Sequence, residues 1–245
     1  MKNMTRLSAA MLAVSLLLTG CFNEDESKTG PVDAIAGFDP VPLPGGKAVI
    51  PFPFDGLFAG ATTPTLNIPN PDANPLVAQA NLLDGFSTTA SVFVDIFGFI
   101  DMASVAENVV IVRRDTGEIL VHGVDYTIQR ATVTDSGIPL DRQRTRLLIE
   151  PLKPLAPSTT YLVGVKRQMR TTDGGHLIPS RMFSIMASSA AISAQTEPLL
   201  NSYSAEQKAV LESLRSRLIG PAIAYLTTFG KVKAATLAPD QMRFP

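Results

Sequence analysis

The sequence contains no tryptophan, one cysteine and two histidines among its 245 residues. A single cysteine cannot form an intrachain disulfide, and two distant histidines without a second thiol leave no ligand spacing for a zinc site. Without tryptophan the chain lacks the large flat ring that would serve as a platform for a sugar. The formal net charge of −1 is too small to favour nucleic acid as a partner. We therefore expect no metal or other cofactor and no nucleic-acid partner.

The first 21 residues follow the pattern of a lipoprotein signal peptide. Two positive charges precede an apolar run, residues 7–18, which is shorter than the roughly 20 residues that a bilayer core requires. The motif Leu18-Thr19-Gly20-Cys21 then resembles the lipobox of bacterial lipoproteins. In such proteins the cysteine thiol takes a diacylglycerol unit, the chain is cut before it, and the new amine is acylated.

We therefore expect residues 1–20 to be removed and Cys21 to attach the exported chain to a membrane. A chance thiol behind an ordinary signal peptide is the alternative. Phe22 rather than aspartate follows the cysteine. In enteric-type bacteria this favours the outer membrane, and it leaves the choice between the periplasmic face and the cell surface open.

The mature chain divides into three parts by composition. Residues 21–46 are first charged and then rich in proline and glycine, which predicts a flexible tether, because such a segment buries too little apolar surface to offset its ordering entropy. Residues 47–190 alternate short apolar segments with turns, and residues 191–245 have helical periodicity. We therefore predict a folded domain over 47–190 and a helical segment over 191–245.

A short helix is predicted early in the folded domain, and strands follow it. Asn74 and Pro75 offer an N-cap and a first helical residue, so residues 76–83 are expected to be helical. Asp115-Thr116-Gly117 predicts a hairpin in which the glycine supplies a positive φ. The predicted strands cover residues 92–97, 109–113, 118–121, 126–133, 146–150, 161–167 and part of 181–186. Short, regularly spaced strands predict a mainly β fold, an antiparallel Ig-like β-sandwich.

The C-terminal segment begins with a helix start signal. Ser204 and Gln207 have the spacing of a capping box, and an apolar face follows it at residues 210, 211, 214 and 218. Gly220-Pro221 is expected to break or kink this helix. Because little sequence follows to cover the apolar face, we expect the segment to be the start of a missing C-terminal domain.

A serine hydrolase site is not predicted within the 245 residues. The Gly-x-Ser-x-Gly pentapeptide of a nucleophile elbow does not occur, and Ser87, in Gly85-Phe86-Ser87-Thr88-Thr89, lacks the second glycine. His122 and His176 follow or flank turn residues and are interpreted as exposed loop or strand-end side chains. An unrecognised hydrolase that uses Ser87 is the weakest of the alternatives.

Other polar groups have simple interpretations. Asn70, Asp72 and Asn74 alternate as ligands do in calcium loops, but prolines interrupt them, so a turn with a helix N-cap is favoured. Asp95 and Asp101 are interpreted as solvated or turn residues. The basic residues Lys166, Arg167 and Arg170 are interpreted as ordinary surface.

Three linked stretches resemble the N-terminal region of bacterial extracellular, virulence-factor-type lipases. They are Ile50–Phe58 (IPFPFDGLF), Gly60–Pro69 (GATTPTLNIP) and Leu83–Thr89 (LDGFSTT). A fourth stretch, Leu152–Val165 (LKPLAPSTTYLVGV), is similar to bacterial Ig-like domains, in which such a turn leads into a strand. The resemblance covers residues 47–229.

The resemblance implies an anchoring role without catalysis in this chain. Some members of that family are surface lipoproteins that release fatty acids from phospholipids, and their catalytic part, an α/β-hydrolase, lies C-terminal to the region that this chain matches. Residues 231–245 depart from the family pattern, as an early stop or a frameshift would make them. We therefore expect a non-catalytic N-terminal anchor and accessory domain, whose partner is a C-terminal α/β-hydrolase domain or a separate, split hydrolase. The alternative is a stand-alone surface binding or adhesion module.

Overall fold

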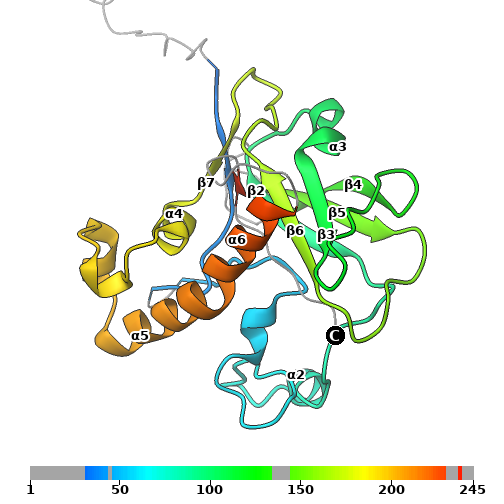
Figure 1. The fold of residues 1–245 in the computed structure, drawn as a ribbon. Helices are drawn as coiled ribbons and strands as arrows, with labels where there is room; N and C mark the ends of the chain where they lie inside the picture. Colours follow the sequence, from blue (N-terminus) through cyan, green and yellow to red (C-terminus); the bar gives the residue numbers. More distant parts are fainter. Residues whose placement is uncertain (1–30, 44–45, 134–143, 230–236, 239–245) are drawn as a thin grey trace, which may run out of the picture. The chain divides into compact units, whose positions relative to one another are not determined.

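Strands and short helices alternate along the part of the chain that the computed structural model describes, residues 31–43, 46–133, 144–229 and 237–238 (Figure 1). The strands are β1 (Ala34–Ala36), β2 (Val92–Phe97), β3 (Val109–Arg113), β4 (Tyr126–Val133), β5 (Arg144–Pro151), β6 (Tyr161–Lys166), β7 (Leu177–Pro179) and β8 (Leu237–Ala238). The α-helices are α2 (Pro75–Ala80), α3 (Val105–Asn108), α4 (Arg181–Ala187), α5 (Ala205–Leu214) and α6 (Gly220–Thr228). Shorter turns are the 3₁₀ helices η1 (Asp55–Phe58), η2 (Met102–Ser104), η4 (Ile192–Ala194) and η5 (Pro198–Ser202), and the π-helix η6 (Arg215–Ile219).

Two sheets enclose one apolar core. The five-stranded sheet has the order β4-β5-β2-β1-β7, and the three-stranded sheet has the order β3-β6-β8. Alternate residues from both sheets meet between them, among them Val94 and Leu147 of the first sheet and Ile111 and Val163 of the second. Neither sheet could bury these apolar side chains alone, so the two layers stabilise each other.

The predicted fold class is correct in part. The two sheets, the short helix before β2 and the helical C-terminal segment are present, although one strand of the larger sheet, β1, precedes that helix. However, β1 and β7 run parallel, so the larger sheet is mixed rather than antiparallel. Helical residues also outnumber strand residues in the described ranges, so "mainly β" is too narrow a description.

The tether predicted for residues 21–46 is wrong for its second half. Ala34–Ala36 forms β1, which pairs with β2 on one side and β7 on the other. Ala34 and Ala36 are fully buried in the core, whereas Ile35 between them points outward. The average composition of residues 21–46 does not predict this strand, because three small or apolar residues contribute little to an average that proline and charged residues dominate.

Most predicted strands are confirmed. Residues 92–97, 109–113 and 126–133 form β2, β3 and β4 with the predicted bounds. Gly117 has φ of +74° in the hairpin after β3, as the turn requires. Residues 118–121 return beside β3 through an isolated bridge between Val112 and Ile119 rather than as a full strand.

The strand predicted within 181–186 is wrong, because this segment is the helix α4. The Ser180 side chain accepts a hydrogen bond from the backbone N–H of Phe183 and caps the helix. The buried side chains Met182, Phe183, Ile185 and Met186 recur at three- and four-residue intervals. This spacing is typical of a helix with one buried face, so the signal was present in the sequence.

The C-terminal helices pack on the rest of the chain. The capping box of Ser204 and Gln207 is confirmed, with both of its hydrogen bonds present. Leu211 and Leu214 of α5 join a core with Phe38, Phe54 and residues of α4. Ala222 and Leu226 of α6 pack against β3 and β6. All of these described residues belong to the compact unit that begins at Val32.

The predicted break at Gly220-Pro221 takes the form of a π-helical turn. The N–H of Gly220 bonds to the carbonyl of Arg215, five residues earlier, and Pro221 then sits in the first turn of α6. Proline has no N–H to donate, so widening the preceding turn lets the helix continue past it. Figure 1 shows α5 and α6 as one succession of helical turns.

A buried carboxylate links two strands on the outer face of the larger sheet. Asp95 of β2 is 5% exposed and accepts hydrogen bonds from Arg144 and Arg146 of β5, at 2.7–2.9 Å. Arg146 also lies over the ring of Phe93, 3.9 Å from its centroid. The interpretation of Asp95 as a solvated residue is therefore wrong.

Replacing Asp95 with asparagine should destabilise the fold. The variant leaves two guanidinium groups without their carboxylate, and breaking such a pair is expected to lower the free energy of unfolding by about 3 kcal/mol. Urea unfolding of both proteins measures the change. The control Asp115→Asn breaks an exposed pair with Arg113 and should cost less than about 1 kcal/mol. Equal losses in the two variants would contradict the structural role of Asp95.

Glu212 should make stability sensitive to acid. Hydrogen bonds from Arg215 and the N–H of Ile192 lower the pKa of Glu212 from 4.5 to about 2. Its carboxylate therefore stabilises the fold above pH 4.5, and this contribution is lost as pH falls from 4.5 towards 2. The difference in unfolding free energy between the wild type and Glu212→Gln should shrink over that interval.

Urea unfolding at pH 6, 4 and 3 tests the Glu212 prediction. A matched control is Glu197→Gln, which removes a carboxylate from an exposed ion pair with Arg181 and should change little at any pH. A constant difference for Glu212→Gln across the pH range would show that the carboxylate does not act through its charge.

Candidate functional site

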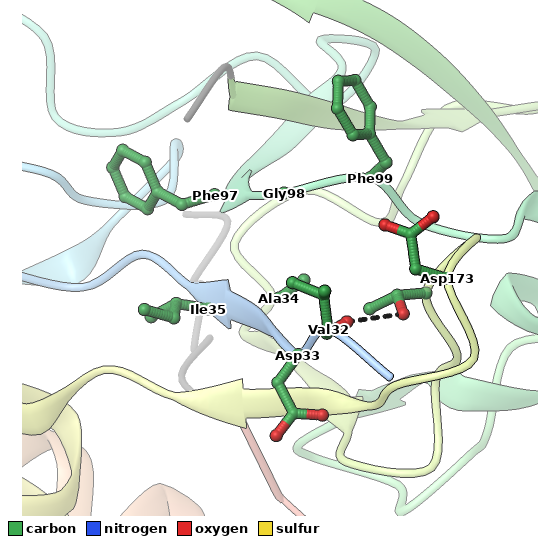
Figure 2. Close-up of a pocket in the computed structure, with 9 residues that line it drawn as sticks. Val32, Asp33, Ala34, Ile35, Phe97, Gly98, Phe99 and Asp173 are labelled. Atoms are coloured by element: carbon green, nitrogen blue, oxygen red, sulfur yellow. Dashed lines mark hydrogen bonds between the residues drawn. The ribbon is translucent and has the colours of Figure 1, made fainter. Parts of the chain in front are cut away.

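A cleft of about 510 Å³ lies beside β1 (Figure 2). We call it the β1 cleft. Three segments line it, and their lining residues are Val32, Asp33, Ala34 and Ile35, then Phe97, Gly98 and Phe99, and finally Thr171 and Asp173. Its volume falls within the range of about 300–1,000 Å³ that is typical of small-molecule pockets.

Backbone and side-chain hydrogen bonds fix the three segments to one another. The Thr171 hydroxyl donates to the carbonyl of Val32 at 2.8 Å, which is the dashed contact in Figure 2. The N–H of Thr172 bonds to the carbonyl of Phe99 at 3.2 Å. Asp33 accepts a hydrogen bond from the backbone N–H of His176 at 2.8 Å. The walls of the cleft are therefore held in place by the fold.

Close packing at one glycine shapes the floor of the cleft. Gly98 follows β2 with φ of +120°, a conformation that side chains rarely adopt. A Cβ atom at this position would come within 2.9 Å of the Cβ of Ala34. Only glycine lets β1 approach this point, so the residue pair sets the distance between the two walls.

The cleft borders an exposed apolar stripe on the outer face of the sheet. Ile35 lies opposite Phe97 in β2 and opposite Ile178 in β7. Ile35 is 41% exposed and Ile178 39%, while Val32 at the entrance is 50% exposed. These partly exposed aliphatic side chains extend the apolar wall of the cleft along the outer face of the sheet.

The polar part of the cleft is acidic. Among the described residues, its lining contains the carboxylates of Asp33 and Asp173 and no lysine or arginine. Figure 2 shows the two carboxylates on different sides of Val32. Arg144 lies opposite Phe97 in β5, but its guanidinium binds Asp95. The cleft therefore combines apolar walls with negative charge.

A second exposed apolar surface surrounds helix α2. Leu76, Leu82 and Leu83 are 73%, 77% and 54% exposed, and we call this group the α2 lobe. The helix begins as predicted, with the Asn74 side chain accepting from the N–H of Leu76, and ends at Ala80. Three leucines left in solvent so close together indicate an interaction surface.

The residues considered for hydrolysis do not come together. Ser87 is exposed, and its hydroxyl bonds to Thr89. His122 and His176 are both exposed, as predicted, and His122 contacts the ring of Tyr126. Cys21, the predicted lipid attachment site, lies outside the described residues.

The interpretation of the Asn70–Asn74 segment as a turn and helix cap is confirmed. Asn70 bonds to the backbone N–H and carbonyl of Asn74, so its amide closes the turn. Asp101 also has a local role, since it caps η2 by accepting from the N–H of Ala103. In the cluster of basic residues, Lys166 donates to the backbone carbonyl of Glu107. Within the described ranges, no group of His, Cys, Asp or Glu side chains is arranged to hold a metal ion.

The groups with the clearest pKa shifts lie away from the cleft. Burial raises the pKa of Tyr126, inside the core between the sheets, to about 12. Burial also raises the pKa of Asp39, whose Oδ1 has no hydrogen-bond partner among the described residues. In both groups burial is the largest cause of the shift.

Sequence reasoning missed the β1 cleft because it placed Ile35 in a tether. The available signal was the Ala34-Ile35-Ala36 alternation, in which two small residues flank a large apolar one. In a strand this pattern puts the large side chain on one face and the small ones on the other. The strand pairs with residues about 60 and about 140 positions further along the chain, and no pattern within a few neighbouring residues predicts such pairing.

Among the described residues, no helix has the length and apolar character needed to cross a membrane. Searches with the whole chain find no matching protein-family model and no significantly similar curated protein.

Proposed function

We propose that this chain is the non-catalytic N-terminal anchor and accessory domain of a bacterial extracellular, lipase-like lipoprotein. The observation that carries the proposal is the α2 lobe. Leu83 begins the stretch 83–89 that resembles the lipase family, Leu82 directly precedes it, and Leu76 lies between that stretch and the stretch 60–69. In that family an α/β-hydrolase domain lies C-terminal to this region, and an exposed apolar surface here suits contact with such a domain.

Charge favours a protein over a lipid surface as the partner of the α2 lobe. Between Lys47 and Arg113 the sequence has no lysine or arginine, and it contains six acidic residues. Anionic lipid surfaces attract basic segments, so an acidic, apolar lobe is unsuited to them. The lipid would instead be supplied covalently at Cys21, and the folded part would hold the hydrolase at the outer membrane.

We also propose that the two-sheet core is an Ig-like sandwich. Tyr161 begins β6, and its hydroxyl accepts a hydrogen bond from the backbone N–H of Ala156 at 3.1 Å. A tyrosine at the start of a strand that bonds back to the chain a few residues upstream is typical of Ig-like domains. This contact falls inside the segment 152–165 that resembles them.

A stand-alone surface binding module is the second candidate. The β1 cleft supports it, because residues of one compact unit complete the cleft without a second domain. This function predicts a cooperative, monomeric unfolding transition and saturable binding of a ligand. An aggregating or molten product would count against it.

Purified residues 22–245 should not hydrolyse esters. We expect no release of p-nitrophenol from short-chain esters and no release of fatty acid from phospholipids above the buffer rate. The variant Ser87→Ala serves as the matched control for contaminating activity. Hydrolysis that disappears in Ser87→Ala would overturn the proposal of a non-catalytic domain.

The accessory role predicts a hydrolase encoded nearby. Reading the DNA after the Pro245 codon in all three frames should reveal Gly-x-Ser-x-Gly followed by an acid and a histidine. Their absence would favour the stand-alone module.

Replacing Cys21 with serine should release the protein from the membrane. The wild type should incorporate labelled palmitate and sediment with outer membranes, whereas the variant should do neither, because serine cannot form the thioether. Ser8→Ala, a change inside the apolar run, should leave labelling intact. Labelling that survives in Cys21→Ser would contradict the lipid anchor.

A further inference from the structure

The β1 cleft offers an apolar surface that the fold leaves uncovered. In the larger sheet, Ala34 and Ala36 point into the core, so Ile35 points outward between Phe97 and Ile178. Leaving these side chains in water costs free energy that a bound apolar group would recover. The concave shape of about 510 Å³ fits a small molecule.

The negative charge of the cleft favours an apolar ligand with a positive charge over an apolar ligand with a negative charge. Asp33 and Asp173 both line the cleft, and none of the ion pairs among the described residues involves either carboxylate. Asp33 has one carboxylate oxygen engaged by the N–H of His176, while Asp173 lies on the exposed turn before Gly174. An anionic ligand would be repelled by both groups, and a cationic one would be attracted.

Aromatic rings strengthen the preference for a cation. Phe97 and Phe99 both line the cleft, and the backbone bond between Thr172 and Phe99 brings the ring-bearing segment next to Asp173. The face of an aromatic ring attracts an ammonium or guanidinium group, and a nearby carboxylate adds to this attraction. Apolar walls, aromatic rings and carboxylates together favour one class of ligand, an apolar molecule that carries a cationic group.

We propose that the β1 cleft binds a small apolar molecule that carries a positive charge, such as an alkylammonium ion. The alkyl part lies against Val32, Ile35 and Phe97, and the cation lies beside Asp173 and Phe99. This binding does not depend on the accessory role or on the lipid anchor. A failure to bind would therefore leave the predictions on ester hydrolysis and on Cys21 unaffected.

Three ligands of equal chain length test the charge preference. Octylamine is protonated at neutral pH, octanol is neutral and octanoate is anionic, so they differ only in the head group. Isothermal titration calorimetry on residues 22–245, well below micelle-forming concentrations, should give saturable binding of octylamine. We expect octylamine to bind about tenfold more tightly than octanoate, with octanol between them.

Two variants assign the binding to the cleft. Asp173→Asn keeps the shape of the side chain and should weaken octylamine about fivefold, as removal of a partly exposed charge does, while leaving octanol unchanged. Ile35→Asn should weaken all three ligands. Its matched control is Ile119→Asn, because Ile119 is 40% exposed, close to the 41% of Ile35, and lies outside the cleft.

Each result has a definite meaning. Tighter binding of octylamine that Asp173→Asn selectively weakens would support the proposal. No saturable binding of octylamine, equal affinity for the three head groups, or equal losses in Ile35→Asn and Ile119→Asn would overturn it. Because Asp173→Asn changes an exposed turn, its result does not depend on whether Ile35→Asn folds fully.

Discussion

The three-residue strand β1 joins β7 to the rest of the larger sheet. It pairs with β2 on one side and with β7 on the other, and among the described strands β1 is the one that pairs with β7. The strand can take this place because its core-facing residues are alanines and its neighbours include glycines. A Cβ on Gly175 would come within 2.2 Å of the carbonyl of Val32, so the chain there tolerates no larger residue. The helix α4 follows β7 directly, and its position therefore depends on the same strand.

A second constraint operates on the outer face of the same sheet. Asp95 is neutralised by two arginines, and the ring of Phe93 beneath Arg146 stacks on Phe52 with 5.7 Å between ring centroids. Phe52 in turn meets the edge of Phe86. Buried charge is costly unless it is paired, so the cluster fixes which strands are neighbours and ties the segment around residue 52 to the sheet. The segment around Phe52 is thus positioned by one ion cluster.

The apolar surfaces have different characters, and this difference separates the two proposals. The α2 lobe projects leucines outward and suits a protein partner that can cover them. The β1 cleft is hollow and acidic, and it suits a small ligand that carries a cation. A domain with both surfaces could bind a ligand on one side while it supports a partner on the other. Both roles fit a chain that acts by binding.

Local structure follows from the amino-acid sequence wherever the signal lies within a few neighbouring residues. The Asn74 cap, the Gly117 turn, the capping box at Ser204 and the bounds of β2, β3 and β4 all follow from side chains within one turn or strand. The helix α4 is an exception. Its N-cap Ser180 and the helical spacing of its apolar residues are visible in the sequence, but the series of strands before it predicts a further strand.

The contacts between these elements depend on the packing of distant segments. Ile35, Phe97 and Asp173 are distant in sequence, and they form one cleft because a parallel pair, an antiparallel pair and two glycine contacts place them there. Asp95 was interpreted as solvated because its two arginine partners lie about 50 residues away. Pairing between distant strands depends on the burial of a shared core, which no local pattern contains. For this reason the sequence predicted the elements, and their packing created the site.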